Sequence, residues 1–304
     1  MCLVNCPFGA ISDKSQIFQL IQAIKRGDKV VAAVAPAFVS QFGENVTSSQ
    51  MREAMRQVGF HKVIEVAVGA DMCTAEEAED FLKKVPEQQP FMATSCCPSW
   101  SVMAKKLFPQ FKDYISMAMT PMVLTARLYK KDHPDVRIVF IGPCTAKKLE
   151  ASRRTIRSDV DFVLTFEEMQ GIFDAKGIVP SEMPYDPDDE FSTGTSLGRG
   201  FAVTGGVADA VKKAIAEIDP EREVLVEHAD GLRECRKMLM MAKAGKYNGY
   251  LLEGMGCPGG CVAGAGTITP VKKSTAAVTR YVNEAKVKSV QESAAVKRLR
   301  EVQD

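Results

Sequence analysis

The sequence predicts an α/β protein of two lobes, each with a mostly parallel sheet flanked by helices. Short β-branched runs alternate along the chain with longer amphipathic runs, and a strand–helix–strand succession produces parallel sheets covered on both faces. A segment rich in Pro, Asp, Ser and Gly, residues 176–200, interrupts this alternation. Such a composition indicates a long loop, which we expect to connect the two lobes.

Strands and helices are expected in a regular order along the chain. Strands are predicted where runs are short, β-branched and bounded by turn residues: 29–36, 62–71, 91–96, 136–144, 161–166, 200–206, 222–231 and 250–257. Helical patterns fall between them at 15–27, 74–84, 121–132 and 207–218. The highly charged stretch 274–304 is also helical by pattern, which is typical of a surface helix.

Composition excludes several classes of function. The chain has 304 residues, of which 46% are apolar, so it can bury a large core. Its 39 basic and 38 acidic residues give a net charge of +1 without a basic block, which argues against a nucleic-acid partner. No apolar run approaches the roughly 18 to 20 residues of a membrane span, and no apolar signal region opens the chain. We therefore expect a cytoplasmic protein.

Cysteines are the chemically informative residues. Nine of them in a chain expected to be cytoplasmic indicate metal ligands or reactive thiols, not a disulfide framework. Cys96, Cys144 and Cys257 end three strand-like runs, and the carboxyl ends of parallel strands form the ligand-binding edge of a sheet. Together, Cys97, Cys144, Cys257 and Cys261 would complete either a four-iron cluster or a tetrahedral zinc site.

Glycines follow two of these cysteines in "CPGGCVAGAG", residues 257–266. Because glycine lets the backbone approach a ligand closely, we expect amide N–H groups of this segment to serve sulfur acceptors: those of Gly259, Gly260, Gly264 and Gly266. Cys73 and Cys235 lie within helical patterns and are expected to be core or surface thiols.

Three motifs carry a resemblance to a known family. "TSCCPSW" (94–100), "PCTAKKLE" (143–150) and "EGMGCPGGCVAGAG" (253–266) resemble, in this order, the signatures of the iron-only, or FeFe, hydrogenases. The resemblance extends from about residue 30 to 270. It implies two α/β lobes with the active site in the cleft between them, and an H-cluster as cofactor. That cofactor is a 4Fe-4S cluster joined to a two-iron subcluster bearing CO, cyanide and a bridging azadithiolate.

The resemblance also implies a separate role for each cysteine. It implies that the 4Fe-4S cluster is ligated by Cys97, Cys144, Cys257 and Cys261, with Cys261 bridging to the two-iron unit. Cys96 is then left to pass protons to the bridging amine, a role that suits a thiol able to exchange its proton.

Further site residues are implied in the same way. A proton relay is expected from Cys96 through Glu77, Ser116 and Asp80 to bulk water. Glu77 and Asp80 are three apart on a helical run and share a face, although by pattern alone "AEEAED" could equally be a solvated acidic face.

Other residues are implied to contact the cofactor. Lys147 is expected to hydrogen-bond a cyanide ligand, the alternative being an exposed helix lysine like Lys148. Met255 is expected near the two-iron unit, the alternative being a core side chain. Pro36, Ala37 and Pro143 are expected to line the cofactor pocket.

This chain departs from the family pattern around the expected pocket. Gly142 stands where most members have methionine, and Ala37 where well-studied members have serine. Met119 and Met122 replace the usual lysine and glutamine. These changes indicate a divergent subgroup.

The predicted function is reversible H2 oxidation and proton reduction, as in ferredoxin hydrogenases. Expected partners are a ferredoxin-like electron carrier or iron–sulfur domain and the maturation proteins that insert the two-iron unit. Three alternatives stay open: a regulatory H2 or redox sensor, a non-catalytic iron–sulfur assembly factor, and a structural zinc protein. We expect a remnant of a ferredoxin-like domain at 1–13, with Cys2 and Cys6, an H-cluster domain at 14–270 and a helical tail at 271–304.

Overall fold

The computed structural model describes residues 7–8, 13–188 and 194–303. The expectation for Cys2 and Cys6 therefore lies outside the described residues. The elements are α2 (Ile17–Lys25), β1 (Val30–Val34), η1 (Pro36–Phe38), α3 (Ser48–Val58), β2 (Lys62–Glu65), α4 (Ala67–Lys84), β3 (Phe91–Ala93), α5 (Pro98–Leu107), η2 (Pro109–Tyr114), α6 (Pro121–Asp132), β4 (Arg137–Gly142), α7 (Ala146–Ala151), β5 (Phe162–Thr165), α8 (Phe166–Lys176), η3 (Pro180–Glu182), α9 (Ser196–Gly200), α10 (Gly206–Ile218), β6 (Leu225–Asp230), α11 (Leu232–Lys243), β7 (Tyr250–Met255), η4 (Cys261–Ala263), α12 (Val271–Asn283) and α13 (Ala294–Gln303).

Two compact units make up the chain, and each contains one sheet. The first unit comprises Met1–Val66, Thr125–Ser192 and Val262–Val278, and the second comprises Ala67–Leu124, Thr193–Cys261 and Thr279–Asp304. Every strand pair in both sheets is parallel. The predicted α/β class with two parallel-sheet lobes is confirmed, while the domain boundaries at 13 and 270 stay predictions.

The sheet of the first unit has the strand order β2-β1-β4-β5. In its centre, Val31 of β1 lies opposite Lys62 of β2 and Ile138 of β4. All five residues of β1 are buried, because helices cover both faces of a parallel sheet. Helix α3 packs on β2, α8 packs on β4 and β5, and α7 packs on β5.

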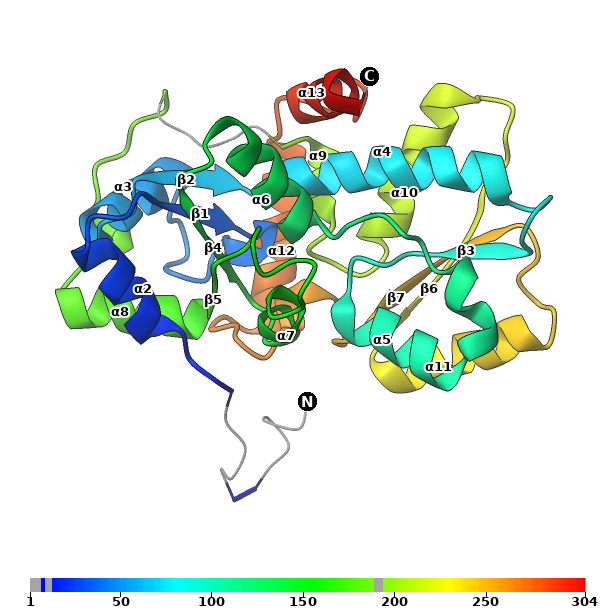
Figure 1. Ribbon diagram of the computed structural model, residues 1–304, viewed down its shortest axis with the longest axis horizontal. Helices are drawn as coiled ribbons and strands as arrows, with labels where there is room; N and C mark the ends of the chain where they lie inside the picture. The colour runs from blue at the N-terminus through cyan, green and yellow to red at the C-terminus, as the bar shows by residue number, and fades with distance from the viewer. Residues whose placement is uncertain (1–6, 9–12, 189–193, 304) are drawn as a thin grey trace. The chain divides into compact units, whose positions relative to one another are not determined.

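In the second unit the order is β3-β7-β6, with Ala93 opposite Leu252 and Leu252 opposite Glu227. On one face α4 and α10 enclose a core that includes Phe81 and Leu251. On the other face α5 and α11 enclose a second core that includes Trp100. Figure 1 shows these two helix pairs above and below the sheet.

Two strand predictions are wrong. The run 62–71 is a strand only to Glu65, since α4 begins at Ala67. The run 200–206 is not a strand: α9 ends at Gly200 and α10 begins at Gly206. A Cβ on Gly206 would lie 1.9 Å from the Gly200 carbonyl oxygen, so the backbone folds back on itself there. Glycine permits this turn, whereas β-branched neighbours give the run a strand-like pattern.

Candidate metal and proton-transfer site

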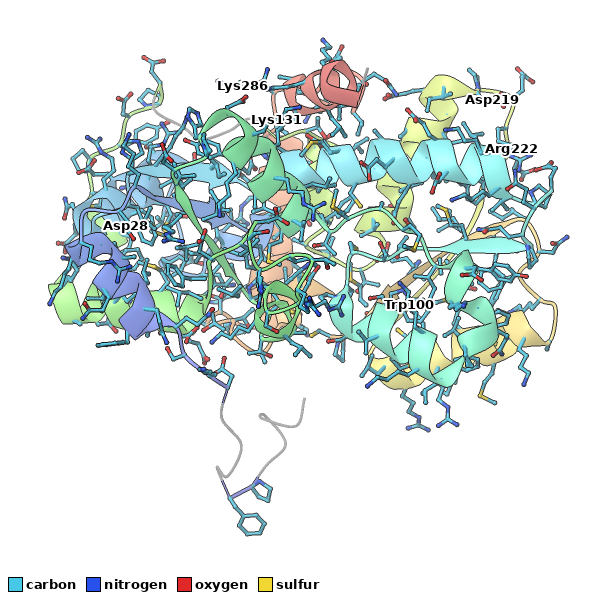
Figure 2. The ribbon with its side chains drawn as sticks, viewed as in Figure 1. Asp28, Trp100, Lys131, Asp219, Arg222 and Lys286 are labelled. Atoms are coloured by element: carbon cyan, nitrogen blue, oxygen red, sulfur yellow. The ribbon has the colours of Figure 1, made fainter. Side chains whose placement is uncertain are left out.

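The paired cysteines lie in the turn between β3 and α5. Pro98 is the first residue of α5, where its fixed φ suits a helix start and its missing N–H costs nothing. Cys97 is the N-cap, with φ −90° and ψ 110°. Trp100, labelled on α5 in Figure 2, donates from its indole Nε1 to the Thr94 carbonyl at 2.9 Å. This hydrogen bond fixes the turn from which both thiols project.

Cys97 lies where a backbone amide reaches its sulfur. Its Sγ accepts the backbone N–H of Gly256 at 3.3 Å, and the side chain is only partly buried. The amino-terminal end of α5 also favours negative charge at this position. A Cβ on Gly256 would lie 2.7 Å from the Ser99 Cβ, so only glycine allows the amide to come this close.

Cys96 has the opposite environment. It is 9% exposed, and burial raises the pKa of its thiol well above the ordinary value, with further increases from the charges of Glu77, Cys97 and Glu253. The thiol is therefore protonated at neutral pH. Because the thiolate is the form that binds metals, a thiol that stays protonated is a poor metal ligand.

Glu77 is a fully buried carboxyl on α4. Burial raises its pKa to about 7, and hydrogen bonding from the Ser116 hydroxyl and the Ser95 amide opposes part of this shift. The Ser95 N–H lies 3.3 Å from Glu77 Oε1. Ser116 is fixed in turn, because its N–H donates to Ala93 O at 2.7 Å. A carboxyl with this pKa can both accept and release a proton near neutrality.

The remaining relay residue, Asp80, lies one helical turn beyond Glu77. Its Oδ2 forms an ion pair with Lys84 Nζ at 2.7 Å, and its side chain is 31% exposed. The structure thus brings Cys96, Glu77 and Ser116 together in the buried part of the second unit. Asp80 lies at the surface, in contact with Lys84.

Cys257 and Cys261 flank a loop that follows β7. Both are partly buried, and Gly259 and Gly260 between them have φ of +95° and +92°. A Cβ on Gly260 would lie 2.7 Å from the Thr204 backbone N. Only glycine satisfies both the left-handed backbone and this close approach.

The glycine amides are used differently from the prediction. Gly259 donates to Asp230 Oδ2 at 2.9 Å, Gly260 to Cys257 O at 3.0 Å, and Gly266 to Pro143 O at 2.9 Å. These three amides serve oxygen acceptors, because the loop must satisfy its own carbonyls and a neighbouring carboxylate. Among the glycines that the structure describes, Gly256, which lies just before the predicted segment, donates its amide to a sulfur, Cys97 Sγ.

Cys144 follows β4 in the first unit. In the same unit, Pro143, Pro36 and Ala37 are buried, and their place in a cofactor pocket stays a prediction. A Cβ on Gly264 would lie 2.4 Å from the Pro143 carbonyl oxygen, so the glycine segment packs directly on the backbone that carries Cys144.

Lys147 is buried rather than exposed. It is 8% exposed, and its Nζ forms an ion pair with Glu150 Oε2 at 2.7 Å. Its neighbour Lys148 is also largely buried, in contact with Asp13 and Glu168. The alternative of an exposed helix lysine is wrong for both, because Lys147 pairs with Glu150 within α7 and Lys148 pairs with Asp13 and Glu168 outside it.

Packing accounts for one departure from the family pattern, Gly142. A Cβ on Gly142 would lie 2.6 Å from Phe140 Cε1, so Phe140 fills the space that a methionine at 142 would need. Met255 and Met122 are buried, and Met119 is half-buried.

The cysteines of the second unit, Cys97, Cys257 and Cys261, have the chemistry of iron–sulfur cluster ligands. Among the described residues, no group of three His, Cys, Asp or Glu that could hold a metal ion is found. A four-iron cube takes one thiolate at each iron. The partly buried thiols, the amide donor on Cys97 Sγ and the left-handed glycines fit such a cube. Cys73 and Cys235 are fully buried, so of the two alternatives expected for them, core or surface, the core alternative holds.

Sequence reasoning missed two carboxylates. Glu253 is fully buried in β7 and accepts the backbone N–H groups of Gly205 and Ala208 at 2.8 Å each. An acidic residue inside the apolar run "YLLEGM" was the sequence signal that could have revealed it. Asp230 ends β6 and contacts the loop after β7. A lone acidic residue before a glycine gives little signal without the fold.

Comparison with known proteins decides the family. Residues 28–265 match the family described as "Iron only hydrogenase large subunit, C-terminal domain". The chain belongs to this family. Within the part of the chain that the structure describes, no helix is long and apolar enough to cross a membrane.

Some curated proteins similar to this chain are named as hydrogenases, and others as iron–sulfur assembly components. "NADP-reducing hydrogenase subunit HndD" of Solidesulfovibrio fructosivorans is 29% identical over 87% of the chain and 54% of that protein. "Cytosolic iron-sulfur assembly component 3" of Rattus norvegicus is 27% identical over 78% of the chain and 60% of that protein. The chain thus spans about half the length of the first relative. A solved variant of FeFe-hydrogenase HydA1 from Chlamydomonas reinhardtii has the same fold, with a TM-score of 0.77 and 21% identity over 95% of this chain and 94% of that chain.

Proposed function

We propose that this chain interconverts H2 with two protons and two electrons at an H-cluster. The observation that carries this proposal is that the buried Cys96 thiol lies close enough to the buried Glu77 carboxyl for its charge to raise the pKa of the thiol, next in sequence to Cys97, whose Sγ accepts the Gly256 amide. An iron–sulfur electron carrier needs no buried proton-exchanging pair next to a ligand, whereas H2 chemistry needs protons delivered to the metal.

The ligands proposed for the four-iron cube are Cys97, Cys144, Cys257 and Cys261. When bound, the cofactor supplies the redox chemistry and the site at which H2 is made or split. Pro36, Ala37, Pro143, Lys147 and Met255 are proposed to line it. Lys147 brings a buried cation able to donate to an anionic ligand, and Met255 brings a soft apolar side chain.

The proton route is proposed to begin at Cys96. Its protonated thiol gives up a proton and recovers one from Glu77, whose pKa of about 7 matches neutral pH. The Ser116 hydroxyl can relay that proton because it both donates and accepts. Asp80, at the surface beside Lys84, is proposed as the exit to water.

Electrons are proposed to enter from a ferredoxin-like carrier or an attached iron–sulfur domain. Insertion of the two-iron unit is proposed to require maturation proteins. The cytoplasmic location remains a prediction from composition.

A non-catalytic iron–sulfur assembly role is the second candidate, and a sensor on the same scaffold is a variant of it. The relative named as an assembly component favours this candidate, as does the ion pair that holds Lys147 to Glu150. The buried Cys96–Glu77 pair has no use in that role.

Infrared spectroscopy of the protein after maturation tests the proposal. Bands in the CO and cyanide stretching regions, together with exchange of H2 against deuterated water, are expected. A Cys97→Ser variant treated identically is the control and should lack both. A fully matured sample with four-iron clusters but without those bands would support the assembly role instead.

A further inference from the structure

One carboxylate oxygen holds the loop that carries Cys257 and Cys261. Asp230 Oδ2 accepts the Gly259 N–H at 2.9 Å and the Thr204 hydroxyl at 3.1 Å. Thr204 closes the arrangement, since its own N–H donates to Gly259 O at 3.3 Å. The Gly259 N–H is therefore held by Asp230 at the end of β6, and the Gly259 carbonyl by Thr204 in the segment before α10.

The pairing of β6 with β7 places Asp230 beside the loop that carries Cys257 and Cys261. Asp230 is the last residue of β6 and lies opposite Met255 of β7 in the parallel register. Gly231 follows with φ +76°, and a Cβ there would lie 3.6 Å from Pro258 Cγ. Strand pairing on one side and the loop on the other leave the carboxylate little freedom to move.

The hydrogen bond has an electrostatic consequence for the loop. The potential of an iron–sulfur cluster depends on hydrogen bonds to its sulfurs and on nearby net charge. Gly256 donates its amide to Cys97 Sγ, but Asp230 withdraws the Gly259 amide from any sulfur and adds a negative charge. Both effects disfavour an added electron.

We propose that Asp230 is a positioning residue that holds the Cys257–Cys261 loop and lowers the reduction potential of the four-iron cluster bound there. This inference rests on the cluster-binding part of the proposed function and needs no H2 chemistry.

The test uses the full chain with its four-iron cluster reconstituted in the absence of the two-iron unit. Asp230→Asn removes the charge but keeps an oxygen acceptor for Gly259 and Thr204. The matched control is Glu227→Gln: Glu227 lies on the same strand and lines the same open hollow of about 440 Å³ as Asp230, but its carboxylate contacts the Tyr247 hydroxyl. Iron per chain and the midpoint potential, followed by electron paramagnetic resonance, are the readouts.

Asp230→Asn is expected to keep its iron and to make cluster reduction about tenfold more favourable, about 59 mV for one electron. Glu227→Gln should leave the potential unchanged. Asp230→Ala, which also loses the acceptor, should lose iron, and the asparagine variant should restore it. An unshifted potential in Asp230→Asn, an equal shift in Glu227→Gln, or full iron retention in Asp230→Ala would each overturn the proposal.

The two proposals fail in different ways. A wild-type chain that binds no cluster overturns both. A potential shift in Asp230→Asn combined with no H2 exchange in matured wild type supports the role of Asp230 and overturns the hydrogenase function alone.

Discussion

Replacing the buried carboxyl of Glu77 should stabilise the protein at high pH while removing turnover. The side chain is fully buried, and its pKa is raised from 4.5 to about 7, chiefly by burial. Below about pH 4.5 the group is protonated in both folded and unfolded chains. As the pH rises to 7 the unfolded chain loses the proton first, so folding becomes progressively less favourable.

The size of this penalty follows from the shift. About 2.5 pH units at 1.36 kcal/mol each give a cost of about 3 kcal/mol, fully present above about pH 7. Glu77→Gln has no such titration and keeps an oxygen acceptor for the Ser95 amide. The variant should therefore gain about 3 kcal/mol relative to wild type between about pH 4.5 and about pH 8.

Urea unfolding of the purified chain at about pH 4.5 and about pH 8 measures the difference. Glu87→Gln, the same change at an exposed position after α4, is the control and should follow the wild-type pH dependence. If the difference in unfolding free energy between Glu77→Gln and wild type is the same at both pH values, Glu77 does not have a raised, near-neutral pKa. The proposal that Glu77 exchanges protons with Cys96 would then fail as well.

Two further predictions concern the first unit. Lys147→Met removes the cation that pairs with buried Glu150 and should destabilise the chain by about 3 kcal/mol in urea unfolding. Adding Glu150→Gln to Lys147→Met should recover most of that loss. A double variant as unstable as the single variant would contradict the ion-pair account. Gly142→Ala should cost about 1–3 kcal/mol because its Cβ meets the Phe140 ring. In a Phe140→Leu background the cost should shrink, and a cost that is unchanged there would show that Phe140 does not fill the site.

The fold was largely predictable because parallel strands buried on both faces carry a strong sequence signal. Runs such as 136–144 and 250–257 contain β4 and β7. The run 200–206 was wrongly predicted as a strand because its apolar and β-branched centre, residues 201–204, is strand-like, although glycines stand at both of its ends. Its true course depends on Glu253, which binds the Gly205 amide from a strand almost fifty residues away, and such a long-range contact leaves no local signal.

The site was predictable only in part. Strand alternation predicts that Cys96 and Cys97 face different surroundings, but β3 ends at Ala93, so their different burial comes from the turn that leads into α5. The destination of the loop amides was not predictable, because the contact of Asp230 with Gly259 joins residues brought together only by the β6–β7 register. The burial of Lys147 likewise depends on Glu150 and on the packing of α7.

The central claim is that one cysteine of the pair holds iron and the other carries protons. Its most direct test is a side-by-side measurement of iron per chain and H2 turnover in matured Cys97→Ser and Cys96→Ala. Cys97→Ser should lose iron and turnover together. Cys96→Ala should retain wild-type iron and lose most of its turnover, and equal iron loss in the two variants, or undiminished turnover in Cys96→Ala, would contradict the account.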